Sequence, residues 1–582
     1  MDKEKNNLYK LLFISVLMYI VLCNLSKLNQ IYVIDDEFGY WGVGAYFAGY
    51  DWTGLTPTSP YYGYGLGFIY MIFFKIFKDA TIMYKAAIVL NALLLVCAYL
   101  LSIRCIKKIY NNIDEKHIIL YCSIAALYPN LIVQSQVGWT ECLLYFWFWL
   151  CVYIVIEIWN NPNIIKCVFF AVILSYGYMV HQRTLGVIIS GILTIALGIV
   201  LKKLNIKQGI IFFAIILLCF IVGHEIKLNL QENFWLTLDQ DVAGMNNISG
   251  QVGKIQYIFS LQGIKDLCIG IIGKIIYLIT STYGLILVVI PILFKNVIYI
   301  IKKSCVEKCL WKLKIKEISF LFLMLAFCST FAISVIFMIF YDTRLDIVVY
   351  GRYIEFTIGP LLIIGFLEAR EYITEKKYVF IGTICIFAIM SILGYAIREN
   401  VFSAFHGMNA VGIAEYFSRL NLASYAFYKI AIILFIIIVL IYILEKLQKK
   451  WNSLLRLGVY LIIIFTIWNS AIEYNWKAIY DAQSSYAKNT QDVAEAIREN
   501  EKDSTIQYVT AESVDGLEKD ELYDRNIKYI QFYLYDKKIE VSGVSKIKDN
   551  CLYIIRKDSL AFKEMRMKKQ IVYENDMYAV LE

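Results

Sequence analysis

The sequence predicts an α-helical membrane protein that crosses the bilayer many times and ends in a small α/β domain. Of its 582 residues, 59% are hydrophobic and only 18% are charged, whereas about a quarter of the residues in soluble domains are charged. Apolar runs long enough to cross a bilayer recur along the chain, for example at 318–340 and 378–396. From about residue 478 onward, the composition becomes that of a soluble protein.

Basic residues gather in alternate short loops, which the positive-inside rule assigns to the cytoplasm. This alternation predicts about thirteen transmembrane helices, with the N-terminus inside and the C-terminus outside. The net charge of +8 is therefore a topology signal and gives no reason to expect a nucleic-acid partner. The expected spans are 8–26, 82–103, 117–134, 141–159, 165–180, 184–201, 208–224, 272–294, 318–340, 353–368, 378–396, 429–444 and 457–473.

The first apolar run follows three lysines and precedes no small-residue cleavage site, so we expect an uncleaved first span in a multi-pass protein of the cytoplasmic membrane. The 14 cysteines are scattered, mostly within apolar segments. Their spacing suggests neither a disulfide framework nor a zinc site. We expect them to pack as small hydrophobic side chains.

Three of the expected outer segments are long. They cover 27–81, 225–271 and 398–428, whereas the cytoplasmic loops are short connections. Long loops between packed elements usually carry function. We therefore expect chemistry on the outer face.

The chain divides into a membrane domain, 1–475, and a soluble outer domain, 476–582. In the second part, "SYAKNTQDVAEAIREN" has the spacing of an amphipathic helix. The segments "TIQYVT", "IKYIQFYLYD", "CLYIIRKD" and "YAVLE" have the composition of strands. A nucleotide loop, a serine elbow and a metal motif are all missing from this segment of sequence.

The densest acidic cluster follows the first span, in "VIDDEFGYWGVGAYFAGYDW". Asp35, Asp36 and Glu37 could simply be solvated beside the membrane, and the aromatics after them could form an interfacial belt. The same residue types would also build an aromatic floor for a sugar ring with carboxylates at its edge. The next stretch, 61–77, is apolar, but as a span it would reverse the sidedness of every later basic loop. We therefore expect it to be an interfacial helix.

The order of a first span, "DDEFGYW", "AGYDWTGLTP" and "SPYYGYGLGFIYMIFFKIF" resembles the first outer loop of the GT-C membrane glycosyltransferases. Protein O-mannosyltransferases and the aminoarabinose transferase of lipid A belong to that family. In that family an acidic pair opens the loop, and surface "jaw" helices follow it. Here Asp36 and Glu37, with Phe38 after them, would be that pair. The resemblance covers most of the chain in layout, but mainly the first loop in residues.

The resemblance implies transfer of a sugar from a polyprenyl phosphate to an acceptor, with inversion at the anomeric carbon. Asp36 is then the expected general base, Asp35 is the close alternative, and Glu37 is the third acid of the cluster. Glu141, in "SQVGWTECLLYFWFWL", matches a second family acid that orients the acceptor or binds a cation, although it could merely snorkel to the headgroups. The metal is unknown. If a divalent cation such as Mg or Mn takes part, Asp36 and Glu141 are its expected ligands.

A lipid-phosphate leaving group needs cations at the outer face. The candidates are His181 and Arg183 in "VHQRTLG", and Arg344 and Arg352 in "YDTRLDIVVYGRYIEF". Each could instead snorkel or pair with a neighbouring carboxylate. The aromatic residues expected to contact sugar or lipid are Tyr40, Trp41, Tyr61, Tyr62 and Tyr353.

The partners implied by the resemblance are membrane lipid, a polyprenyl-phosphate sugar and a cell-envelope glycan, glycolipid or protein as acceptor. One alternative is a flippase or transporter for lipid-linked sugars, which predicts charges in mid-membrane and broken helices in paired halves. Another is a polysaccharide polymerase, which usually relies on arginines in a large outer loop. The 225–271 segment contains no arginine.

Overall fold

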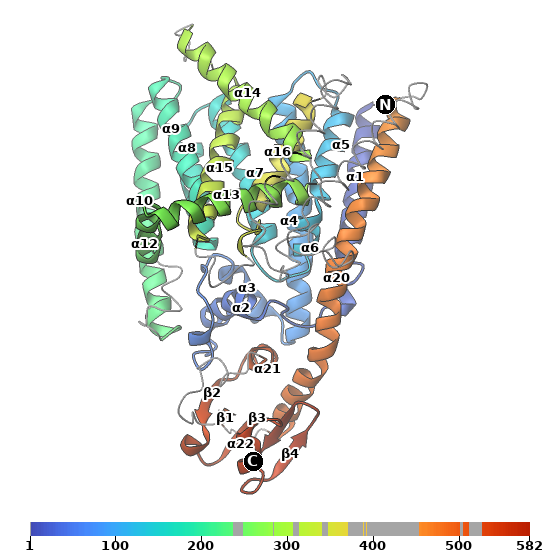
Figure 1. The fold of residues 1–582 in the computed structure, drawn as a ribbon, viewed down its shortest axis with the longest axis vertical. Coiled ribbons are helices and arrows are strands. Elements are labelled where there is room, and N and C mark those ends of the chain that lie inside the picture. The colour runs from blue at the N-terminus through green and yellow to red at the C-terminus, as the bar shows by residue number, and fades with distance from the viewer. Residues whose placement is uncertain are drawn as a thin grey trace.

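The chain folds into a helical bundle with a small sheet domain at one end (Figure 1). This computed structural model describes residues 2–236, 248–282, 285–306, 313–339, 347–369, 388, 392, 453–500, 505–510 and 526–582. Six of the described helices are long and apolar enough to cross a membrane: Glu4–Lys27, Ala80–Ile109, Glu141–Asn160, Gln182–Val200, Ile206–Asn233 and Ile315–Phe337. The chain is a multi-pass membrane protein.

The bundle is built from long helices joined by short turns. Asp79 begins one of them, since its side chain accepts a hydrogen bond from the amide of Ile82 at 2.7 Å. Many outward-facing side chains are large and apolar, which suits a lipid environment. The bundle helices are α1 (Asp2–Leu22), α4 (Ala80–Ile109), α5 (Glu115–Ala126), α6 (Pro129–Gln134), α7 (Glu141–Asn160), α8 (Ile164–Val180), α9 (Leu185–Val200), α10 (Ile206–Asn233), α12 (Ile248–Ile258), α13 (Leu261–Ser281), α14 (Leu285–Val306), α15 (Ile315–Phe337) and α16 (Glu355–Ala369), with 3-10 turns η1 (Leu25–Lys27) and η3 (Gln182–Thr184).

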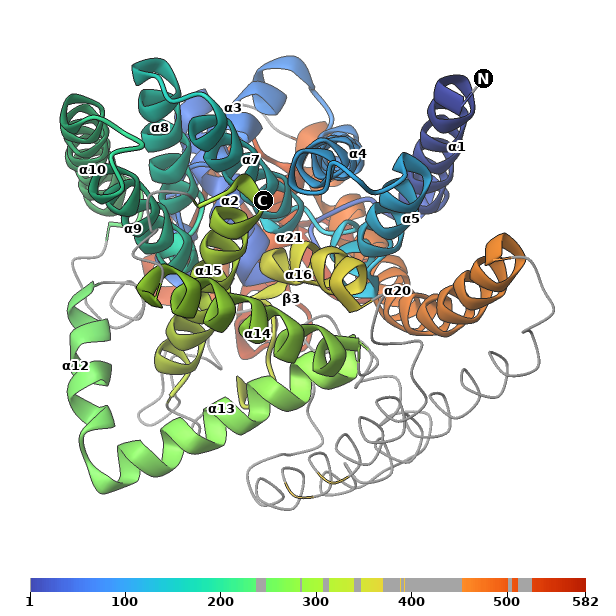
Figure 2. The same ribbon diagram turned by 90° about the horizontal axis from the view of Figure 1, so that it is seen from above.

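Two expected spans differ from the observed helices. The expected helix 117–134 is divided into α5 and α6, because Pro129 begins a new helix. The expected helix 272–294 combines the end of α13 with the start of α14. In Figure 1, α13 runs across the vertical helices, and Figure 2 shows α12 and α13 along one side of the bundle. The expected spans 378–396 and 429–444 and the outer segment 398–428 lie outside the described residues, so thirteen spans stay a prediction.

The segment 27–81, expected as the first outer loop and called by that name below, forms two helices and a 3-10 turn, α2 (Ile34–Ala48), η2 (Thr56–Thr58) and α3 (Gly67–Ile76). They lie between the bundle and the sheet domain (Figure 1). Helices α2 and α3 can touch because glycine stands at their contact. A Cβ on Gly44 would lie 2.6 Å from the Tyr70 Cβ, and one on Gly67 would lie 2.4 Å from a Val43 methyl. The expected helix 61–77 is thus shorter, beginning only at Gly67.

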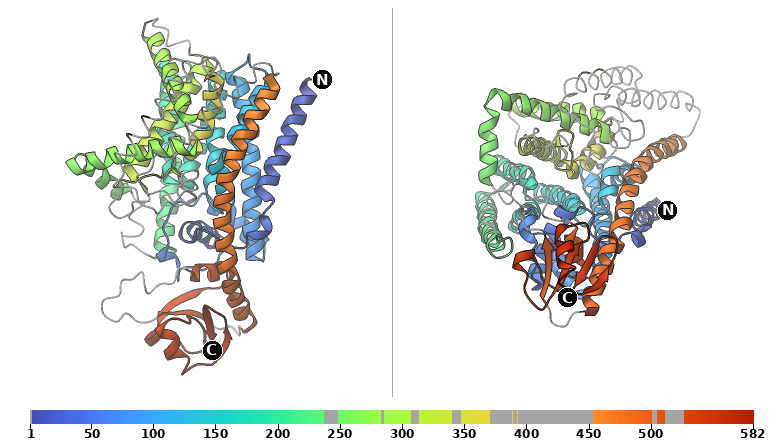
Figure 3. Two further views of the ribbon diagram at one scale, coloured as in Figure 1. Left: turned by 45° about the vertical axis from the view of Figure 1, so that its right-hand side comes forward. Right: turned by 60° about the horizontal axis from the view of Figure 1, so that its bottom comes forward.

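The C-terminal part begins inside a single helix, α20 (Ser453–Asn500), which runs without interruption from the expected last span into the sheet domain. The five-stranded sheet has the order β2-β1-β3-β5-β4. Strand β1 (Thr505–Thr510) is parallel to β2 (Ile539–Gly543) and β3 (Cys551–Arg556), whereas β5 (Tyr578–Leu581) is antiparallel to β3 and β4 (Ile571–Glu574). Figure 3 shows this sheet as a separate lobe at the end of α20.

One strand prediction in this domain is wrong. The segment "IKYIQFYLYD" forms the short helix α21 (Ile527–Tyr533), and every residue of that helix is buried. Its alternating tyrosines and isoleucines favour a strand locally, but burial on all sides overrides that preference. The sheet domain also contains η9 (Val544–Lys546) and α22 (Leu560–Met565).

Candidate active site

The three carboxylates of the acidic cluster occupy the first turn of α2. Successive residues on a helix point about 100° apart, so the three side chains reach different parts of the protein. Asp35 pairs with Lys528 of α21 at 2.5 Å. Asp36 pairs with Arg352, which lies just before α16. Glu37 turns toward the loop before α7.

Glu37 accepts four hydrogen bonds and is completely buried. The donors are the amides of Tyr32 (2.5 Å) and Val33 (2.7 Å), the Tyr84 hydroxyl (2.9 Å) and the amide of Gly138 (2.6 Å). Burial raises the pKa of Glu37 to about 7, although the donated hydrogen bonds act in the opposite direction. These contacts fasten the start of α2 to α4 and to the loop before α7.

Asp36 lies where the first outer loop meets the bundle. Its Oδ1 accepts a hydrogen bond from the Tyr62 hydroxyl at 2.7 Å, and its Oδ2 accepts one from Nη1 of Arg352. The Asp36 side chain is 17% exposed, which makes it more accessible than Glu141 at 2%. Of these two paired carboxylates, Asp36 is therefore the one better placed to meet a molecule from outside.

Glu141 begins α7 and is held by two arginines. Its Oε1 accepts hydrogen bonds from Nη2 of Arg183 at 2.8 Å and from Nε of Arg352. Arg183 comes from η3 and also donates from Nη1 to the Arg352 carbonyl at 3.0 Å. Thus Asp36, Arg352, Glu141 and Arg183 form one chain of alternating charges, brought together from four distant segments. We name these four residues the charge network.

Both arginines of the charge network retain donor capacity. Nη2 of Arg352 and Nε of Arg183 are buried and have no hydrogen-bond partner. The Arg352 guanidinium stacks on the Trp139 ring, with 3.8 Å from its central carbon to the ring centre. Buried donors usually have partners, so these two nitrogen atoms suit an additional anion such as a phosphate.

His181 lies in the hinge between α8 and η3, beside the charge network. Its Nδ1 accepts a hydrogen bond from the Arg183 amide at 3.1 Å, and its ring stacks on Tyr62 at 5.6 Å. Burial and the charges of Arg183 and Arg352 hold the pKa of His181 well below its usual value. His181 is therefore neutral and cannot supply positive charge to a phosphate at neutral pH.

The predicted aromatic residues separate into two groups. Tyr62 contacts Asp36, Tyr40 stacks on Tyr62 at 5.8 Å, and Tyr353 meets the His181 ring edge-on at 5.6 Å. These three line the charge network. Trp41 instead stacks on Tyr70 at 3.9 Å, and Tyr61 packs against Trp235 at 5.2 Å. Arg344 lies outside the described residues.

Sequence reasoning missed two residues that contact this site, Lys528 and Trp139. Lys528 was placed on an expected strand, although a lone lysine inside the apolar run "IKYIQFYLYD" is a signal that a buried partner exists. Trp139 stands two residues before Glu141 but carried no separate signal, because tryptophans are common at membrane interfaces.

A divalent cation would compete with Arg352, whose guanidinium already contacts both Asp36 and Glu141. Among the described residues, no group of three or more His, Cys, Asp or Glu side chains could hold a metal ion. The sequence leaves the metal unknown and names Asp36 and Glu141 as ligands only if a divalent cation takes part, and this conditional assignment is untested.

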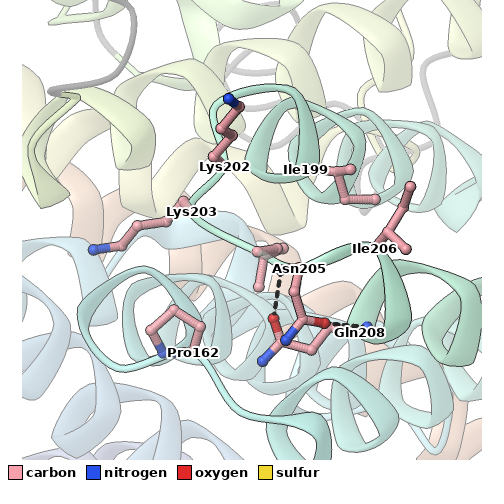
Figure 4. Close-up of a pocket in the computed structure, with 8 residues that line it drawn as sticks. Pro162, Ile199, Lys202, Lys203, Asn205, Ile206 and Gln208 are labelled. Carbon is pink, nitrogen blue, oxygen red and sulfur yellow. Dashed lines mark hydrogen bonds between the residues drawn. The ribbon is translucent and has the colours of Figure 1, made fainter.

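A surface pocket lies elsewhere in the protein, where α9 turns into α10 (Figure 4). Its lining residues are Pro162, Ile199, Lys202, Lys203, Leu204, Asn205, Ile206 and Gln208. Asn205 and Gln208 exchange hydrogen bonds there at 2.8 and 2.9 Å. Since those bonds form the capping box that begins α10, the pocket has a structural explanation.

The chain was compared with known protein families, sequences and structures. No family model and no curated protein sequence matches the chain. ArnT from Cupriavidus metallidurans, solved bound to undecaprenyl phosphate, matches with a TM-score of 0.53 and 10% identity over 98% of this chain and 97% of that one. Its apo structure matches with a TM-score of 0.53 and 11% identity over the same shares. Both extend over nearly the full length of each chain. The chain has the GT-C fold.

The apo oligosaccharyltransferase of Archaeoglobus fulgidus, also a GT-C protein, matches with a TM-score of 0.37 and 10% identity over 91% of this chain and 64% of that one. The two ArnT matches confirm the GT-C resemblance at the level of fold. The small C-terminal α/β domain is confirmed as well. Helices α2 and α3 form in the segment where the jaw helices are expected, and their role as jaw helices stays a prediction.

Proposed function

We propose that this protein is a membrane glycosyltransferase that moves a sugar from a polyprenyl-phosphate donor to a cell-envelope acceptor on the outer face. The observation that carries the proposal is the charge network, which combines a partly exposed carboxylate with two buried guanidinium groups on a GT-C fold. For stability alone, an apolar cluster would serve as well as buried ion pairs. Their presence at the junction of loop and bundle favours a role in chemistry.

The donor class is supported by the free donors of the charge network. Nη2 of Arg352 and Nε of Arg183 provide two donor nitrogens for the oxygens of a lipid phosphate. The ArnT structure with undecaprenyl phosphate supports the same class of lipid. The outer face is supported by the distribution of basic loops, which assigns the first outer loop to the side away from the cytoplasm.

In the proposed reaction, Asp36 is the general base. An acceptor hydroxyl gives its proton to the Asp36 carboxylate while its oxygen forms a bond to the anomeric carbon. The bond between that carbon and the phosphate oxygen breaks, and polyprenyl phosphate leaves with both bonding electrons. Arg352 and Arg183 stabilise the negative charge on the leaving phosphate. Attack opposite to the leaving group inverts the anomeric centre.

Arg352 links proton transfer to Asp36 with stabilisation of the leaving phosphate, because its guanidinium contacts Asp36 directly. A bound phosphate attracts the guanidinium and weakens its hold on Asp36. The base then becomes free to accept a proton when the donor is in place. Glu141 keeps both arginines near the phosphate through its two contacts.

The test is transfer of radiolabelled sugar from a panel of polyprenyl-phosphate sugars to envelope acceptors, using purified protein. Asp36→Asn is expected to lose transfer by at least ~100-fold, and Glu141→Gln is expected to weaken it through misplaced arginines. Asp51→Asn is the matched control, since Asp51 is a 49% exposed carboxylate of the same outer loop. Full activity of Asp36→Asn would refute the base assignment. Absence of both transfer and polyprenyl-phosphate release with every donor would favour a transporter.

A further inference from the structure

Lys528 is an unusual residue of the C-terminal domain because it is buried at the start of α2. Its side chain is 1% exposed, and its Nζ lies 2.5 Å from Oδ1 of Asp35. The same Nζ lies 5.6 Å from the centre of the Phe38 ring, on the next turn of α2. The ammonium group of Lys528, near the start of α21, therefore contacts the turn of α2 that carries Asp36.

The direction of Asp36 depends on how α2 is rotated about its axis. The contacts of Asp35 and Glu37 fix that rotation from both sides of Asp36 in sequence: Lys528 holds Asp35 toward the C-terminal domain, and Tyr84 with Gly138 holds Glu37 toward the bundle. Neighbouring side chains point about 100° apart. Holding both neighbours leaves Asp36 one direction, toward Arg352 and Tyr62.

The Lys528–Asp35 pair is not required to attach the domain to the loop, since other contacts do that. The Trp52 indole donates to the Tyr535 carbonyl at 2.8 Å, Phe532 meets Trp41 edge-on at 5.1 Å, and Lys538 pairs with Asp51 at 2.8 Å. A buried ion pair adds little stability over an apolar contact. What this pair adds is a fixed direction for the first turn of α2.

We propose that Lys528 is a positioning residue for the reaction: through Asp35 it sets the orientation of Asp36, and so makes the C-terminal domain part of the active site. The proposal rests on the proposed function of Asp36. It also assigns Asp35, the alternative base considered from sequence, to positioning, because its carboxylate faces Lys528 instead of the charge network.

The experiment compares Lys528→Met, Lys528→Arg and the matched control Lys538→Met in the full-length protein. Lys538 belongs to the same domain and pairs with the same outer loop, but away from the first turn of α2. Lys528→Met is expected to lower kcat by ~10- to 100-fold with little change in KM for the donor, because a displacement of about 1 Å at a reacting group has this effect. Lys528→Arg is expected to recover part of the loss, and Lys538→Met to behave as wild type.

A second readout does not depend on transfer. Hydrogen exchange of the α2 amides is expected to accelerate in Lys528→Met and to stay unchanged in Lys538→Met. If the wild-type protein transfers no sugar, the proposed function fails, while the exchange data still decide whether Lys528 holds α2. If Lys528→Met does not fold, Asp35→Asn removes the same ion pair at its more exposed partner. This variant is expected to show the same loss of kcat.

The proposal is overturned if Lys528→Met and Asp35→Asn keep kcat within twofold of wild type. It is equally overturned if Lys538→Met loses as much activity as Lys528→Met, because the loss would then reflect domain attachment. An unchanged rate of α2 amide exchange in Lys528→Met would also contradict it.

Discussion

Three adjacent carboxylates in one helical turn have three different environments. Glu37 is fully buried and receives four hydrogen bonds, whereas Asp35 and Asp36 each face a cation. Burial raises the pKa of Glu37 from 4.5 to about 7. A carboxyl group with a raised pKa in the fold retains its proton longer in the folded state than in the unfolded state.

This predicts how Glu37 affects stability. As pH rises from about 4.5 to about 7, the Glu37 contribution to the free energy of unfolding decreases by at most ~3–4 kcal/mol, since each unit of pKa shift corresponds to about 1.4 kcal/mol. Glu37→Gln should be less stable overall, because the amide nitrogen meets hydrogen-bond donors, but should lose this part of the pH dependence. The check is the melting temperature in detergent between pH 4.5 and 8. Glu564→Gln, an exposed change, should keep the wild-type profile.

The sequence points to most residues of the site by two routes. Arg183 and Arg352 are conspicuous because charges at the ends of apolar spans are rare, whereas the roles of Asp36 and Glu141 are implied by the GT-C resemblance. The fold brings all four together. Which of them touch could not be predicted, because that depends on how distant segments pack. Nothing in the sequence indicated that Arg352 contacts both carboxylates.

At the scale of elements, the wrong predictions also arise because the packing of distant segments cannot be read from the sequence. Pro129 divides an expected span and is visible in the sequence, but α21 reads as a strand because its residues prefer strands locally. Its helical form depends on burial between the sheet domain and α2, which only the assembled fold supplies. The continuity of α20 was similarly missed, since a change of composition near residue 478 indicated a domain boundary where the backbone continues.

The continuous α20 makes a prediction of its own. Ala478 is exposed and lies within α20 where the expected membrane and soluble parts meet. Ala478→Pro should kink the helix at a cost of about 3 kcal/mol. The kink would displace the sheet domain and break the contact of Lys528 with Asp35 at the start of α2. Ala478→Gly should cost only about 1 kcal/mol and leave the domain in place. Limited proteolysis and transfer activity measure the effect, and wild-type behaviour of the proline variant would show that α20 does not need to be continuous.

At the scale of the whole molecule, the protein has two chemically different ends. Lys10 of α1 and Lys107 of α4 both pair with Glu115 at the start of α5, at 2.6 and 2.8 Å. The N-terminus and the first basic loop are therefore at one end of the bundle. Helix α20 runs from that end of the bundle to the sheet domain. The C-terminus therefore lies at the opposite end of the molecule (Figure 1).

This polarity predicts the orientation in the membrane, because loops rich in lysine and arginine remain in the cytoplasm. A cysteine at Lys568, whose side chain is 58% exposed in the sheet domain, should react with a membrane-impermeant maleimide in intact cells. A cysteine at the exposed Lys207, in the first turn of α10, should react only after permeabilisation. Labelling is compared with that of the parent protein, which contains 14 cysteines. The reverse pattern would put the charge network near the cytoplasmic face, where an acceptor in the outer envelope could not reach Asp36.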